Sequence, residues 1–258
     1  MLYSMDHTVK WTGSTHVEQC KMTHSTGKTI TKEEIASGYD RIAHKIGLDD
    51  AFYERCLDMH SAYLGKILDI GCGKGSLLLK LAARRPALDV QLHGVDISPV
   101  LCSIARQNVP HAEIIEGDAE RLPYMSEMFD FIFMTEALEH MLDYDAAVSE
   151  LVRVLKSGGI AVITVPNHDW MSFEFYDRRR NKKRQPVDDH YFRFQEISEI
   201  LSTHGLTIVN VRGSDNLFYY GWKHNFIEQP LAFFFPFLQK RMKRLILKCV
   251  KSPDSKSE

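Results

Sequence analysis

The sequence has few cysteines and no paired cysteine motif. Five occur among 258 residues, and no two of them form a CxxC pair. An odd, scattered set argues against a disulfide framework and against a structural zinc site. We therefore expect reduced thiols, in a reducing compartment, at Cys20, Cys56, Cys72, Cys102 and Cys249.

A long apolar run and a strong net charge are also missing. No stretch approaches the roughly 20 apolar residues that span a bilayer, and residues 1–30 are polar, without the apolar centre of a signal peptide. The formal net charge of −2 provides no overall field that attracts nucleic acid or lipid. We therefore expect a cytoplasmic protein, whose contacts with a membrane or with RNA would depend on local patches.

Short apolar segments alternate with helix-forming segments along most of the chain. Strands separated by helices indicate an α/β protein with a parallel sheet and helices on both faces. Right-handed crossovers place the carboxyl ends of such strands on one rim, where ligands bind. Strands are expected over 66–70, 90–95, 113–116, 129–134, 160–165, 206–211 and 245–250, and helices over 31–46, 49–63, 76–84, 99–108, 144–155 and 195–204.

A glycine-rich turn joins the first expected strand to the next helix and reads DIGCGKG over residues 69–75. Glycines let the backbone approach a ligand and adopt positive φ angles. The free N–H groups at the start of the following helix suit a carboxylate or a phosphate. The spacing is GxGxG, whereas nicotinamide-binding turns read GxGxxG.

Two acidic residues follow the next two strands. Asp96 ends the second strand, where a carboxylate can accept both hydroxyls of a ribose. Asp118 follows the third strand beside Ala119, where it can accept from the exocyclic amine of adenine. Groups suited to an amino acid carboxylate, a ribose and an adenine together indicate S-adenosylmethionine.

These motifs give the chain a family resemblance. ILDIGCGKG, GVDIS, GDAERLPYMSEMFDFI, EALEHMLD and LVRVLKSGGIAVITVPN cover about residues 35–167. In this order they resemble class I S-adenosylmethionine-dependent methyltransferases, specifically the type 11 subgroup. The resemblance implies a Rossmann-like, doubly wound, mostly parallel sheet of seven strands, and S-adenosylmethionine as the cofactor. It implies that Asp69, Gly71 and Gly73 hold the methionine end, Asp96 the ribose, and Asp118 and Ala119 the adenine, with Ile97, Thr135 and Tyr39 as further cofactor contacts.

Methyl transfer from a sulfonium needs alignment and exclusion of water more than a dedicated catalytic group. His140, after the fourth strand, is the candidate general base, because a histidine titrates in the appropriate range. The alternative is that it packs behind the pocket. With Glu136 and Glu139 it also forms an ExxEH pattern, which resembles the metal ligands of two branches of the family, but we expect no metal.

The resemblance divides the chain into three regions. Residues 1–30 are expected to be a mobile N-terminal segment, and 31–213 the class I methyltransferase domain, with a basic insertion near 167–189. Residues 214–258 are an aromatic and basic extension that completes the sheet or caps the substrate site.

The acceptor is the least defined part of the prediction. The segment LAFFFPFL (231–238), with basic residues after it, packs in the core or lies at a membrane interface. A small-molecule or lipid-like acceptor is therefore expected, with peripheral membrane contact as an open alternative. An RNA acceptor is disfavoured because the chain has no separate RNA-binding module, and a non-catalytic scaffold that binds the cofactor is the remaining alternative.

Overall fold

The computed structural model describes residues 30–45, 47, 50–84, 90–170, 173, 189–215 and 236–253. Several expected features lie outside these ranges: the N-terminal segment 1–29, the basic run 178–184 within the expected insertion, and residues 231–235 of the apolar segment.

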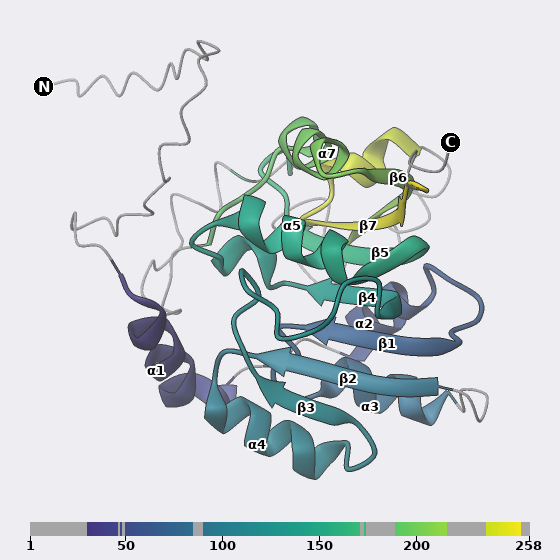
Figure 1. Cartoon of the computed structure of the whole chain (residues 1–258). Helices are drawn as coiled ribbons and strands as arrows, with labels where there is room; N and C mark the ends of the chain where they lie inside the picture. Colours follow the sequence, from purple (N-terminus) through teal and green to yellow (C-terminus); the bar gives the residue numbers. More distant parts are fainter. Residues whose placement is uncertain are drawn as a thin grey trace, which may run out of the picture.

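The described chain is built around one sheet of seven strands (Figure 1). The order is β3-β2-β1-β4-β5-β7-β6, with β1 to β5 parallel and β7 antiparallel to both of its neighbours. This confirms the predicted mostly parallel, seven-stranded α/β fold. The strands are β1 (Gly65–Ile70), β2 (Val90–Asp96), β3 (Glu113–Glu116), β4 (Phe129–Thr135), β5 (Leu155–Pro166), β6 (Leu206–Ser214) and β7 (Arg244–Lys251).

Helices pack on both faces of this sheet, and two apolar clusters of buried residues result. One cluster joins the sheet to α2, α3 and α4, and the other joins it to α5 and α7. Successive side chains of a strand point to opposite faces of the sheet, so Ile67 and Leu68 of β1 belong to different clusters. The helices are α1 (Lys32–Ile42), α2 (Asp50–Leu57), α3 (Ser76–Ala83), α4 (Pro99–Asn108), α5 (Tyr144–Val154) and α7 (Phe194–Thr203), with short 3-10 turns η1 (Ala43–Lys45), η2 (Leu138–His140) and η4 (Pro236–Arg241).

The apolar residues near the end of the chain form β7, between β5 and β6. Leu245, Ile246, Leu247 and Cys249 are fully buried there. Burial of apolar side chains from two neighbouring strands explains why this late segment enters the sheet. Strands β5 and β7, whose paired residues are 78 to 90 positions apart in the chain, therefore lie side by side in the core.

Two elements differ from the sequence-based expectation. The second helix ends at Leu57 rather than near residue 63, and the Tyr63 hydroxyl donates to the Leu57 carbonyl at 2.7 Å, which satisfies a terminal acceptor. The fifth strand begins at Leu155 rather than at 160, with a register shift against Phe129–Phe131. Gly158 takes a φ of 74° within it, so the chain bends without leaving the sheet.

None of the helices in the described ranges has the length and apolar composition that crossing a bilayer requires.

Candidate functional site

A cavity of about 860 Å³ lies at the carboxyl ends of the parallel strands. Its size is near the upper end of the range for small-molecule sites, roughly 300–1,000 Å³. It opens where β1, β2, β3 and β4 end, which is the ligand-binding edge of a doubly wound sheet. Every residue that the sequence suggested for the site lines it: Tyr39, Asp69, Gly71, Gly73, Asp96, Ile97, Asp118, Ala119, Thr135 and His140.

The glycine turn is fixed to the second strand by hydrogen bonds. The Gly71 N–H donates to the Val95 carbonyl at 2.8 Å, and the Gly73 N–H donates to Asp96 Oδ2 at 2.8 Å. Gly71 has a φ of 72°, and a Cβ there would lie 2.7 Å from the Ala137 Cβ. This position therefore requires glycine for both conformation and space.

Buried carboxylates flank the glycine turn. Asp69 is 1% exposed, and no described group forms a hydrogen bond with its Oδ1. Burial and the nearby Asp96 raise the pKa of Asp69 well above its usual value. Burial also raises the pKa of Asp96, although N–H groups of Ser98 and Gly73 partly offset this effect. Both acids therefore favour a ligand that brings hydrogen-bond donors or a positive charge.

Asp118 lies at another edge of the cavity, after β3. Its Oδ1 accepts from the Glu120 N–H at 3.0 Å and from Lys32 Nζ at 3.1 Å. Lys32 also forms an ion pair with Glu120. The predicted adenine contact is therefore linked to the first turn of α1, which the sequence did not reveal.

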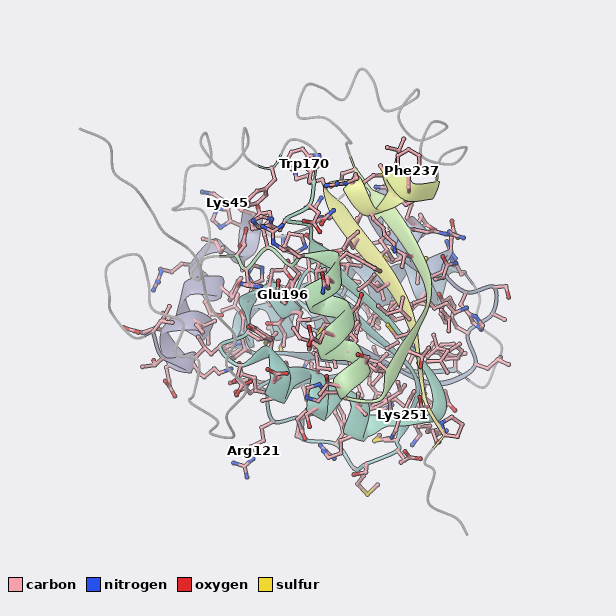
Figure 2. All side chains as sticks on the ribbon, turned by 90° about the horizontal axis from the view of Figure 1, so that it is seen from above. Lys45, Arg121, Trp170, Glu196, Phe237 and Lys251 are labelled. Carbon is pink, nitrogen blue, oxygen red and sulfur yellow. The ribbon has the colours of Figure 1, made fainter. Side chains whose placement is uncertain are left out.

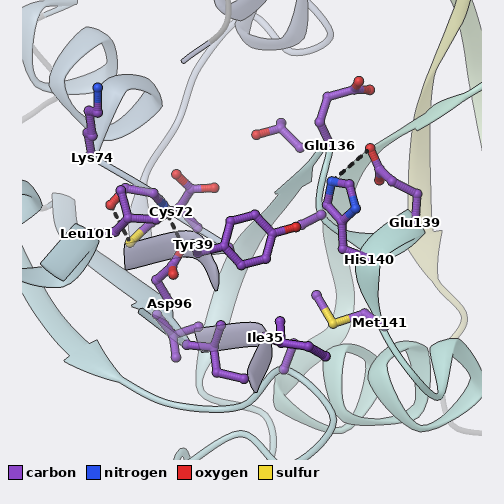
Figure 3. Close-up of a pocket in the computed structure, with 18 of the residues that line it drawn as sticks. Ile35, Tyr39, Cys72, Lys74, Asp96, Leu101, Glu136, Glu139, His140 and Met141 are labelled. Carbon is purple, nitrogen blue, oxygen red and sulfur yellow. Dashed lines mark hydrogen bonds and ion pairs between the residues drawn. The ribbon is translucent and has the colours of Figure 1, made fainter. Parts of the chain in front are cut away.

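Helix α1 covers the cavity and carries Tyr39 into it. The helix begins at a capping box formed by Thr31 and Glu34. Asp40 accepts from the Ser98 hydroxyl at 2.5 Å and so connects α1 to the start of α4. In Figure 3, Tyr39 lies between the side of the cavity that holds Asp96 and the side that holds His140.

Strand β4 ends in a turn that carries several ionisable side chains. Glu136 has a φ of 50°, which is uncommon for a residue other than glycine. Arg244 Nε donates to Glu136 Oε2 at 2.5 Å, and Thr164 Oγ1 donates to Oε1 at 3.1 Å. Arg244 also pairs with Asp215. The strained turn is thus fastened to β5 and β7.

His140 and Glu139 lie deeper in the same turn. His140 Nε2 is 3.8 Å from Glu139 Oε1, and Nδ1 is 3.5 Å from Asp189 Oδ1. Burial lowers the pKa of His140 to about 4. Burial, with the neighbouring Glu136 carboxylate, raises the pKa of Glu139 well above its usual value. The imidazole is therefore uncharged near neutral pH, and the environment of Glu139 shifts that carboxyl towards its acid form.

The ExxEH side chains do not converge on one point. Glu136 turns to Arg244, while Glu139 faces His140. Within the ranges that the structure describes, no three histidine, cysteine or acidic side chains are grouped as metal ligands would be. The arrangement instead supplies hydrogen-bonding groups to the cavity.

Several lining residues escaped the sequence analysis. Arg244, Lys243, Tyr191, Asp189 and Lys32 come from segments far from the family motifs. Only the basic character of residues 240–244 was visible in the sequence. Which of these side chains would reach the cavity depends on the antiparallel pairing of β7 with β5.

Comparison with known proteins identifies the domain. Residues 68–163 match the family described as a methyltransferase domain. They contain the glycine turn, Asp96, Asp118 and the turn after β4. Residues 68–163 thus match a methyltransferase domain of the type 11 family. This confirms the predicted class, whose cofactor is S-adenosylmethionine.

The curated relatives support the same assignment. A ubiquinone/menaquinone biosynthesis C-methyltransferase UbiE from Campylobacter jejuni is 31% identical over 140 residues, which are 50% of this chain and 59% of that protein. A demethylmenaquinone methyltransferase from Thermus thermophilus is 33% identical over 137 residues, 50% of this chain and 61% of that protein. The chain therefore spans about three fifths of the length of these relatives.

Solved structures share the fold. A possible histamine N-methyltransferase from Thermotoga maritima is 17% identical, with a TM-score of 0.59 over 84% of this chain and 100% of that one. The [4+2]-cyclase SpnF is 20% identical, with a TM-score of 0.64 over 86% of this chain and 97% of that one. Because a cyclase has the same fold, the fold alone does not establish the reaction.

Proposed function

We propose that this chain is an S-adenosylmethionine-dependent methyltransferase that acts on a small-molecule or lipid-like acceptor. The observation that carries the proposal is the buried Asp69 carboxyl beside the glycine turn, with an oxygen that lacks a hydrogen-bond partner among the described residues. The ammonium group of a bound amino acid satisfies that oxygen. A dinucleotide pyrophosphate in the same turn would instead face an acidic group.

When bound, S-adenosylmethionine supplies a methyl group on a sulfonium, whose sulfur keeps the electron pair of the broken bond. The residues of the chain align the acceptor and exclude water. Helix α1 covers the cavity, and Tyr39 separates its two sides. No covalent intermediate with the protein is required.

His140 is the proposed general base for an acceptor that loses a proton. Its imidazole is uncharged near neutral pH and its Nδ1 has no hydrogen-bond partner in the described structure. The Asp189 carboxyl, 3.5 Å from Nδ1, would stabilise the imidazolium once the proton arrives. The low pKa means that the transfer depends on that stabilisation.

The names of the relatives support the acceptor class. UbiE and the demethylmenaquinone methyltransferases are named for quinone biosynthesis. Apolar side chains also line the cavity, including Ile35, Met141 and Pro166. A neutral acceptor with an apolar frame fits that lining.

Peripheral membrane contact through the C-terminal segment belongs to the same proposal. Phe237 is 68% exposed on η4, with Lys240 and Arg241 close behind it in sequence. In Figure 2 its side chain projects outward on the same side as Trp170 and opposite Lys251. Sedimentation with phosphatidylglycerol vesicles at low salt tests the contact: Phe237→Ala should release the protein, and wild-type protein that stays in the supernatant refutes it.

The experiment for the main proposal supplies methyl-labelled cofactor and a cell extract. The label should appear in the lipid or small-molecule fraction and disappear with Asp96→Ala. Label confined to RNA or protein would contradict the proposed acceptor class. Absence of label from all fractions, with intact cofactor binding, would favour a non-catalytic binding protein.

A further inference from the structure

The cavity has a part that the proposed cofactor contacts do not account for. Asp69, Asp96 and Asp118 lie on the side formed by β1, β2 and β3. The other side is formed by the turn after β4, by Asp189 and Tyr191, and by the start of β7. Figure 3 shows this separation, with Asp96 and Cys72 on one side of Tyr39 and Glu139 and His140 on the other.

Three buried polar atoms of residues that line this second part have no hydrogen bond in the described structure: Tyr39 Oη, Glu139 Oε2 and His140 Nδ1, the last of which lies 3.5 Å from Asp189 Oδ1. Glu139 is 2% exposed. An unsatisfied buried polar group is costly and uncommon in native proteins. Three around one cavity indicate that a ligand supplies the missing hydrogen bonds.

The three groups lie within reach of one ligand. The rings of Tyr39 and His140 meet edge to face with centroids 5.9 Å apart. His140 Nε2 lies 3.8 Å from Glu139 Oε1. The groups come from α1 and η2, so a ligand between them would also hold α1 over the cavity.

The turn that carries Glu139 is held from both sides. The Glu136 N–H donates to Thr164 Oγ1 at 2.8 Å, and the Glu136 carboxylate is bound by Arg244. The His190 N–H donates to the Glu139 carbonyl at 3.1 Å. Glu139 therefore has a fixed backbone, which favours a defined binding geometry.

The charges around Tyr39, Glu139 and His140 determine whether the subsite favours a charged or an uncharged ligand. Burial favours the uncharged forms of Tyr39, Glu139 and His140, since it raises the pKa of the first two and lowers the pKa of the third. Arg244, which pairs with this turn, is already bound by the two carboxylates of Glu136 and Asp215. Little positive charge would therefore be left to compensate an anionic acceptor group. An uncharged hydroxyl needs no such compensation, and it both donates and accepts hydrogen bonds.

We propose that Tyr39, Glu139 and His140 form the acceptor subsite and bind an uncharged hydroxyl group on an apolar ring. Glu139 donates to the hydroxyl oxygen, His140 accepts the hydroxyl hydrogen, and Tyr39 closes the subsite from α1. The subsite rests on the proposed methyltransferase function, because it places the acceptor beside the cofactor.

The test measures binding of four ring probes to protein saturated with S-adenosylhomocysteine. The probes are 1-naphthol, naphthalene, naphthalene-1-carboxylate and 1-naphthylmethylammonium, with fluorescence as the readout. We expect 1-naphthol to bind at least about tenfold more tightly than the other three, the change that one well-made hydrogen bond produces. Equal binding of naphthalene and 1-naphthol, tighter binding of either charged probe, or binding of no probe would overturn the proposal.

Two substitutions test whether Glu139 forms the hydrogen bond with the hydroxyl group of 1-naphthol. Glu139→Leu should lose about tenfold in 1-naphthol affinity, and Glu139→Gln, which keeps an N–H donor, should stay within about threefold of wild type. A loss in Glu139→Gln as large as that in Glu139→Leu would contradict this assignment, because an uncharged hydrogen-bonding group would then not suffice. Glu199→Leu, at an exposed position of α7, is the matched control and should leave affinity unchanged.

Calorimetry with S-adenosylhomocysteine on the same samples separates the two proposals. Normal binding of that ligand together with failed 1-naphthol discrimination refutes the subsite alone. Failure of folded wild-type protein to bind S-adenosylhomocysteine refutes the proposed function.

Discussion

Lys32, in the first turn of α1, is paired with Asp118 after β3, with 3.1 Å between Nζ and Oδ1. The two residues are 86 positions apart in the chain. The pair fastens α1 over the edge of the cavity where adenine is expected. A bound adenine amine would therefore share Asp118 with Lys32.

Lys32→Met should speed the release of S-adenosylhomocysteine by up to about fivefold, because a partly exposed ion pair contributes up to about 1 kcal/mol. Stopped-flow dissociation measures this rate. Lys156→Met is the control: it removes the pair with Asp130 at the opposite ends of the strands, and should leave the rate unchanged. Slower release in Lys32→Met would show that the lysine hinders the bound state rather than holding α1 closed.

Asp96→Ala should weaken binding of S-adenosylhomocysteine by about 2–3 kcal/mol, because two ribose hydroxyls and the Gly73 N–H lose their acceptor. Isothermal titration calorimetry measures the change. Asp130→Ala removes another carboxylate that accepts from a backbone N–H, that of Lys66, and should cost stability without affecting affinity. An unchanged affinity in Asp96→Ala would remove Asp96 from the site.

Gly71→Ala should destabilise the fold and abolish tight cofactor binding. The added Cβ would lie 2.7 Å from the Ala137 Cβ, at a φ of 72°. Gly158→Ala is the matched control, because its φ is 74° and a Cβ there meets nothing within 4 Å. Urea unfolding should show a loss in Gly71→Ala that exceeds the loss in Gly158→Ala by more than about 1 kcal/mol. Equal losses of unfolding free energy would mean that the turn shifts to accommodate the added methyl group without further cost.

Because of His140, the free energy of unfolding of the wild-type protein should fall as the pH is lowered. Its folded pKa of about 4 lies below the ordinary 6.5, so the unfolded chain binds more protons between these values and the free energy of unfolding falls as pH decreases. Across that window the contribution of His140 amounts to about 3 kcal/mol.

Urea unfolding of wild type and His140→Gln at pH 6.5 and pH 4 isolates this contribution. The raised pKa of Glu139 acts in the opposite direction, but it is present in both proteins and largely cancels in the comparison. The variant should lose less stability than wild type. Parallel losses in the two proteins would show that His140 titrates normally.

The sequence predicted the part of the site whose chemistry is local. The turn 69–75, Asp96 and Asp118 each follow a strand directly, so their place on one edge follows from the alternation of strands and helices. The seven strands were also predicted, because their apolar segments are short and separated by clear turns. Only boundaries differed, as at Leu155, where a bulge continues the strand through Gly158.

The contacts that complete the site depend on tertiary pairing. Arg244 reaches Glu136 across 108 positions, because β7 pairs antiparallel with β5 and places Arg244 opposite Pro166. The register of that pairing has no local sequence signal. The unsatisfied atoms of Glu139, in a turn, and Tyr39, on helix α1, are likewise properties of packing, since polar groups in such short or surface elements are ordinarily solvated.

Calorimetric titration of the wild-type chain with S-adenosylhomocysteine tests the central claim most directly. We expect saturable binding with one site per chain and no measurable heat with NAD. Folded protein that binds NAD, or that shows no heat with S-adenosylhomocysteine, would contradict it.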